Sequence, residues 1–72
     1  MPAFSGVRLR LIREDRGLTK EQLAVNSGRS YSAITKYESG DVVPSGRILG
    51  TLAVALGVGV DELFAAAPAD PA

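Results

Sequence analysis

The chain has 72 residues, enough for one small domain that buries only about 60% of the surface of its unfolded chain. It contains no cysteine and no histidine, so it lacks disulfides, thiolate metal ligands and the commonest general base, a composition that argues against an enzyme, a metal centre and a bound cofactor. The formal net charge is zero, so the total charge by itself gives no support for binding to nucleic acid.

The first predicted helix runs from residue 5 or 6 to residue 16, and Gly17 ends it. At about 100° per residue, one apolar face holds Leu9, Ile12 and Arg16, with Arg13 at its edge. Val7 and Leu11 lie on almost the opposite side and form a second apolar face. Two interpretations of that second face remain open: it covers the C-terminal segment of the chain, or it meets another subunit.

A second helix is predicted to begin at Thr19. The Thr19 hydroxyl and the Gln22 side chain are spaced for a capping box, in which each accepts a hydrogen bond from the other residue's backbone N–H. Leu18 and Leu23 are spaced as a hydrophobic staple across the same helix start. Gly28 follows about two turns later and suits the left-handed conformation in which many helices end.

The third predicted helix is capped by Ser30 and closed by Gly40, so only about three residues join it to the second helix. Helices joined this tightly cross at a steep angle, roughly 90–120°. The apolar positions of the third helix are Ala33, Ile34 and Tyr37, and its outward side holds Tyr31, Ser32, Thr35 and Lys36. Side chains near a helix start project furthest, so this outward side is suited to a DNA major groove, which is about 12 Å wide.

The C-terminal third of the chain continues the helical pattern. Pro44 marks a loop, a fourth helix is predicted over residues 46–56, and Gly57 ends it. Within that helix Gly50 costs about 1 kcal/mol relative to alanine unless it permits close packing. A fifth short helix is predicted to begin near Val60 or Asp61.

The predicted folded domain comprises residues 1–64, and residues 65–72, which include two prolines, are predicted to form a flexible tail. The chain has no apolar run of about 20 residues and does not open with a signal peptide, so we expect a soluble protein with no membrane contact. No nucleotide-binding glycine loop is present, and no small-molecule ligand is expected.

The charges are divided unequally along the chain. Residues 1–47 hold all eight basic residues against five acidic ones, whereas residues 48–72 hold only Asp61, Glu62 and Asp70. This division predicts a basic front half that meets phosphate and an acidic back. Charges scattered over a solvated surface are the alternative, because the excess is small.

Three runs of this sequence together resemble one known family. They are RLRLIREDRGLTKEQLA, SGRSYSAITKYESG and PSGRILGTLAVALGVGVDELF, and they cover about residues 4–64. They are similar to the phage-repressor and Cro (xenobiotic-response-element) family of helix-turn-helix proteins. The resemblance implies an all-α, five-helix, lambda-repressor-like domain, with the helix-turn-helix at 19–39 and its recognition helix at about 30–39.

The resemblance also implies roles for individual residues. Those expected to read base edges are Tyr31, Ser32, Thr35 and Lys36, because they match the outward positions of the family's recognition helix. Those expected to contact DNA phosphates are Thr19, Lys20, Arg29, Ser30, Ser39, Gly40 and Arg47, although Arg29 departs from the family pattern, which is often apolar there. The resemblance further implies a partly buried ion pair between Arg13 and Glu38, tying the first predicted helix to the third.

The leading hypothesis is a sequence-specific regulator of transcription that binds double-stranded DNA, a repressor that recognises an inverted-repeat operator as a homodimer. Its expected location is the cytoplasm of a bacterium, with the gene either bacterial or phage-borne. The alternative is a protein-interaction module, such as an antitoxin-like subunit, that keeps the fold without the DNA role. The zero net charge favours that alternative, and the outward polar side of the third helix favours the regulator.

Overall fold

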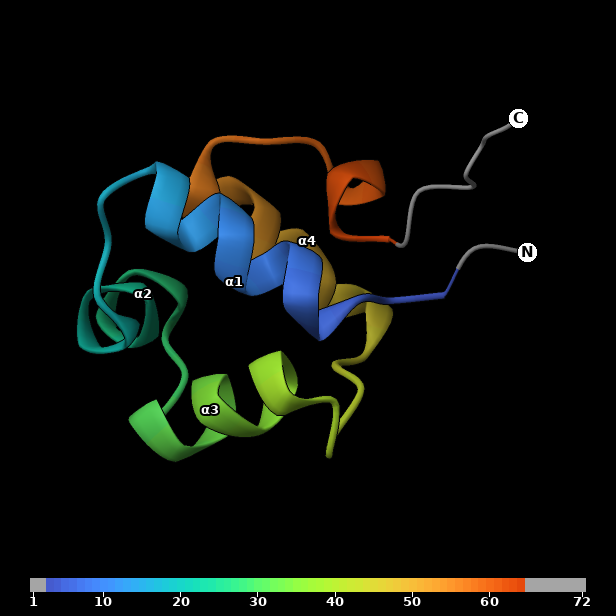
Figure 1. Cartoon of the computed structure of the whole chain (residues 1–72), viewed down its shortest axis with the longest axis horizontal. Helices are drawn as coiled ribbons and strands as arrows, with labels where there is room; N and C mark the ends of the chain where they lie inside the picture. Colours follow the sequence, from blue (N-terminus) through green and yellow to red (C-terminus); the bar gives the residue numbers. More distant parts are fainter. Residues whose placement is uncertain (1–2, 65–72) are drawn as a thin grey trace.

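Four short α-helices and one 3-10 turn make up the part of the chain that the computed structural model describes, residues 3–64 (Figure 1). The elements, in order, are α1 (Gly6–Asp15), α2 (Lys20–Ser27), α3 (Tyr31–Ser39), α4 (Gly46–Leu56) and the turn η1 (Val60–Leu63). The expected all-α class is therefore confirmed. The expected fifth α-helix is wrong, because η1 is a single 3-10 turn. The tail expected at residues 65–72 lies outside the described residues.

Each α-helix begins at a hydroxyl residue whose side chain accepts a hydrogen bond from a backbone N–H three residues later. The four caps are Ser5, Thr19, Ser30 and Ser45. Such caps satisfy one of the N–H groups that the first turn of a helix leaves without an internal partner. Each helix is followed, directly or after one residue, by a glycine with positive φ, so the helix bounds follow from local chemistry.

The helices form a closed circuit around one core. In that circuit α1 packs against α3 and η1, α2 packs against α3 and α4, and α4 packs against η1. In Figure 1, α2 is seen nearly end-on while α3 lies across the view, so these two neighbours cross steeply, as predicted. The buried apolar residues are Leu9, Leu23, Ala24, Ile34, Tyr37, Leu49, Leu52, Ala53, Leu56 and Leu63.

The N-terminal segment is fastened to η1. The backbone N–H of Ser5 donates to the carbonyl of Leu63 at 2.9 Å, and Phe4 forms an isolated antiparallel bridge with Phe64. Arg8 adds a hydrogen bond from Nε to the carbonyl of Glu62 at 2.9 Å. Because Phe64 is extended for this pairing (φ −96, ψ 149), the helical turn ends at Leu63.

The two predicted faces of α1 differ in burial. Leu9 is completely buried, and Arg13, expected at the edge of that face, is also buried, with 7% of its surface exposed. Arg16, expected on the same face, is exposed. On the other side, Val7 and Leu11 are 58% and 51% exposed, so the described C-terminal segment does not cover them. Among the described residues, no helix is long and apolar enough to cross a membrane.

Candidate DNA-binding surface

The pair α2 and α3 is fixed by side-chain hydrogen bonds at both helix starts. Thr19 Oγ1 accepts from the N–H of Gln22 at 3.0 Å, and Gln22 Oε1 accepts from the N–H of Thr19 at 2.8 Å. This is the capping box that the spacing predicts. Ser30 Oγ accepts from the N–H of Ala33 at 3.0 Å and so starts α3.

The link between the two helices turns at Gly28, whose φ of 71° lies in the left-handed region that side chains other than glycine rarely adopt. Ala24 and Ser27 are buried on the side of α2 that belongs to the core. The polar Ser27 is accommodated in the core because its hydroxyl donates to the carbonyl of Leu23 at 2.7 Å. The end of α2 is thus buried with its hydroxyl satisfied, whereas the turn residues 28–30 are exposed.

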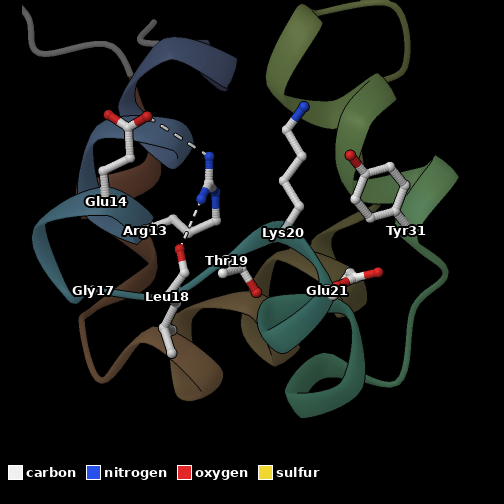
Figure 2. Close-up of a pocket in the computed structure, with 8 residues that line it drawn as sticks. All are labelled: Arg13, Glu14, Gly17, Leu18, Thr19, Lys20, Glu21 and Tyr31. Atoms are coloured by element: carbon white, nitrogen blue, oxygen red, sulfur yellow. Dashed lines mark hydrogen bonds and ion pairs between the residues drawn. The ribbon is translucent and has the colours of Figure 1, made fainter.

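One side chain of α1 fixes both helices of the pair. Arg13 Nε donates to Glu38 Oε2 at 2.6 Å and its Nη2 to Oε1 at 3.2 Å, while its Nη1 donates to the carbonyl of Leu18 at 2.7 Å. Glu38 lies in the last turn of α3, and Leu18 directly precedes the Thr19 cap of α2. Figure 2 shows the bond from Arg13 to Leu18 and a longer ion pair with Glu14.

The Arg13–Glu38 pair is shielded from water, with side-chain exposures of 9% and 4%. Its bidentate geometry fits the planar guanidinium to the carboxylate. The hydrogen bonds to Glu38 raise the pKa of Arg13 above its ordinary high value, against the opposing effect of burial. The guanidinium therefore stays charged, and the pair sets the orientation of α3 relative to α1.

Gly6, at the start of α1, lies against the end of α3. A Cβ atom at this position would stand 2.4 Å from the carbonyl oxygen of Tyr37 and 2.5 Å from that of Glu38. Backbone atoms cannot move aside cheaply, so the approach of α1 to α3 requires a glycine here. The sequence did not predict this packing role of Gly6. The only signal was its position directly after the Ser5 cap, where a helix ordinarily has a residue with a side chain.

The outward side of α3 presents three of the four residues expected to read bases. Tyr31, Ser32 and Lys36 are exposed, and Ser32 and Lys36 line one open hollow together with Ser30 and Val42. Tyr31 lines a second hollow with Thr19 and Lys20. Figure 2 shows Lys20 and Tyr31 extending from α2 and α3 in the same direction. Each hollow is thus lined by a residue of the first turn of α3, Ser32 in one and Tyr31 in the other.

Thr35 departs from its expected place on the outward side. It is half-buried, and its Oγ1 is buried with no hydrogen-bond partner within the described residues. The reason is its position on the helix: Thr35 precedes Glu38 by three residues, about 60° around α3, and Glu38 points toward α1. In this conformation the Thr35 hydroxyl does not face a groove.

The residues expected to contact phosphates differ in whether their polar groups already have hydrogen-bond partners within residues 3–64. The hydroxyls of Thr19 and Ser30 are occupied as helix caps, and that of Ser39 bridges the carbonyl of Lys36 and the N–H of Asp41. At the start of α2, the N–H groups of Lys20 and Glu21 have no hydrogen bond within residues 3–64. Arg29, in the turn, and Arg47, at the second position of α4, are exposed, but neither lines the two hollows.

The basic side chains divide into two groups. Arg8 and Arg13 form the ion pairs present in residues 3–64. The other six make none in that part of the chain: Arg10, Arg16, Lys20, Arg29, Lys36 and Arg47. Four of these six belong to the surface around α2, α3 and the start of α4, and none of the four forms an ion pair with a carboxylate of residues 3–64.

Two short, steeply crossed helices with a glycine turn, the second of which exposes a polar side, define the helix-turn-helix class of proteins. The model of the helix-turn-helix domain family matches residues 6–66. The chain belongs to this family, and within it to the phage-repressor and Cro type that its motifs resemble.

Solved structures of relatives agree in fold. The restriction-modification controller protein C.AhdI from Aeromonas hydrophila is 39% identical, with a TM-score of 0.80 over 82% of this chain and 89% of that one. The clp gene regulator ClgR from Corynebacterium glutamicum is 33% identical, with a TM-score of 0.77 over 81% and 75%.

The c2 repressor of P22, solved in complex with a synthetic operator, is 31% identical, with a TM-score of 0.76 over 81% of this chain and 88% of that one. These relatives are described as a controller protein, a gene regulator and a repressor. None of the curated proteins gives a significant match.

Proposed function

We propose that this protein is a transcriptional regulator that binds double-stranded DNA in a sequence-specific manner and acts as a repressor. The single observation that supports it most is the exposed polar side of α3, with Ser32 and Lys36 free, on a helix that Arg13 and Glu38 fix in orientation. The P22 c2 repressor, similar over 81% of this chain, is solved with its operator.

In this proposal α3 enters the major groove. Lys36 donates to guanine O6 and N7, Ser32 to base edges, and Tyr31 meets a thymine methyl or offers its hydroxyl. Thr35 contacts base edges only after a rotation about its Cα–Cβ bond that turns its hydroxyl outward. The proposed phosphate contacts are made through side chains or backbone N–H groups at both ends of α3 and at the starts of α2 and α4. They are Thr19, Lys20, Arg29, Ser30, Ser39, Gly40 and Arg47.

The operator is proposed to be an inverted repeat read by a homodimer. One recognition helix covers only a few base pairs, and a two-fold partner would place a second one about 34–36 Å away. The exposed Val7 and Leu11 provide an apolar face for such a partner. Sedimentation at micromolar concentration, with and without duplex, tests this: only monomer in both states would contradict it.

Selection of bound duplexes from a random pool tests the function itself. The expected result is a palindromic consensus with two half-sites about one helical turn apart. Failure to retain any duplex, even at low salt, would overturn the proposal and favour a protein-interaction module. Salt separates the two, because binding to DNA should weaken with a log–log slope of about −0.9 per phosphate neutralised, whereas an apolar protein contact is nearly indifferent to salt.

A further inference from the structure

The first residues of α2 and α3 are in contact through a cation and an aromatic ring. Lys20 Nζ lies 5.8 Å from the centre of the Tyr31 ring, within the distance of about 6 Å at which the ring quadrupole attracts an ammonium group. Lys20 is half-buried and forms no ion pair within residues 3–64. The Tyr31 ring is therefore the interaction partner of the ammonium within residues 3–64.

This contact adjoins the free N–H groups at the start of α2. The N–H groups of Lys20 and Glu21 have no hydrogen bond within the described residues, and they stand at the positive end of the helix. The ammonium and these N–H groups belong to the same residue and its neighbour, so both offer positive charge or donors to phosphates at this end of α2. Figure 2 shows the Lys20 side chain extended beside the ring and not folded toward Glu21.

We propose that Tyr31 is a positioning residue for a DNA phosphate contact: its ring holds the Lys20 ammonium ready for the backbone of the duplex, independently of base sequence. This inference rests on the proposed DNA-binding function. It assigns to the ring a role different from base reading, which remains available to the Tyr31 hydroxyl. The contribution of Tyr31 to the affinity for DNA should then require both its ring and the Lys20 side chain.

A double-mutant cycle on a duplex of arbitrary sequence, followed by fluorescence anisotropy over a salt series, tests the proposal. Tyr31→Ala should weaken binding about two- to fivefold, and Tyr31→Phe, which keeps the ring and removes only the hydroxyl, should weaken it less. Lys20→Met should reduce the log–log salt slope by about 0.9. In the Lys20→Met background, Tyr31→Ala should cause no further loss.

Lys36→Met is the matched control, because Lys36 is likewise a lysine without an ion pair within residues 3–64 but does not contact the ring. In that background Tyr31→Ala should retain its full effect. In the free protein, the ring current of Tyr31 should shift the Lys20 Cε protons upfield in an NMR spectrum, and this shift should survive Tyr31→Phe and disappear with Tyr31→Ala.

Equal losses for Tyr31→Phe and Tyr31→Ala, or an undiminished Tyr31→Ala loss in the Lys20→Met background, would overturn the inference while leaving DNA binding intact. Absence of duplex binding by the unsubstituted chain at low salt would overturn the proposed function and the inference together.

Discussion

The two sides of α3 differ in whether their side chains have partners within the molecule. On the inward side, Ile34 is completely buried and Glu38 is held by two hydrogen bonds from Arg13. On the outward side, Ser32 and Lys36 are exposed. Because the inward contacts determine the orientation of the helix, the outward residues can change without disturbing it. Substitutions on the two sides should therefore separate into effects on stability and effects on binding.

The largest effect is expected at Glu38. Glu38→Ala leaves the buried Arg13 guanidinium without its carboxylate, which should lower the free energy of unfolding by about 3–5 kcal/mol. Urea denaturation followed by circular dichroism measures it. The double variant Arg13→Met/Glu38→Leu removes both charges and should be less destabilised than the single one. A loss below about 1 kcal/mol for Glu38→Ala would contradict the assignment of the inward side of α3 to stability, because that side would then tolerate substitution.

Gly6→Ala tests the close approach of α1 to α3. The added methyl group meets two backbone carbonyl oxygens, so the helices must separate, and we expect a loss of about 1–3 kcal/mol in the free energy of unfolding. The helix-forming advantage of alanine acts in the opposite direction but is smaller. Unchanged denaturation would show that the junction between α1 and α3 is looser than the structure has it.

Lys36→Ala, unlike the substitutions at Glu38 and Gly6, should affect DNA binding and not stability. We expect a loss of about 1–3 kcal/mol in binding to the best duplex, a relaxed preference at one base position, and an unchanged midpoint of unfolding. Anisotropy titrations against the selected duplex and its single-base variants, together with thermal melting, measure both quantities. A drop in thermal stability without a change in preference would place Lys36 among the structural residues.

Gly50→Ala is expected to have the smallest effect and serves as a contrast with Gly6. A Cβ atom at Gly50 would have nothing within 4 Å, so the close-packing explanation for this glycine is excluded. The substitution should stabilise α4, raising the free energy of unfolding by about 1 kcal/mol, and should leave DNA affinity unchanged. Destabilisation would reveal a contact that the open space around Gly50 does not predict.

The helix starts and stops were predictable because their causes are local. Thr19 with Gln22, Ser30 and Ser45 each act within three residues, and glycines such as Gly28 mark the ends by their own backbone freedom. Such signals are present in any short window of the sequence. The tertiary Arg13–Glu38 pair, 25 residues apart, came instead from the resemblance to a known family.

The features that the sequence did not predict all depend on packing between distant segments. Gly6 is required because of carbonyl groups more than 30 residues away, and Thr35 is half-buried on a helix whose neighbouring position, Glu38, faces α1. The 3-10 turn at Val60–Leu63 ends early because Phe64 pairs with Phe4. The proximity of Lys20 to the ring of Tyr31 likewise follows from the crossing of α2 and α3. Helical periodicity within each helix does not predict the distance between side chains of two different helices.

The bridge between Phe4 and Phe64 has a consequence for protein engineering. Since these two residues are paired, a short linker can join the backbone there into a ring, and the chain can be reopened between the exposed Val42 and Val43, beyond the N–H groups that bond to the carbonyl of Lys36. Such a circular permutant would keep every helix and its caps intact. It would move both new ends next to the last turn of α3, so that a reporter fused there would sense the arrival of the duplex directly.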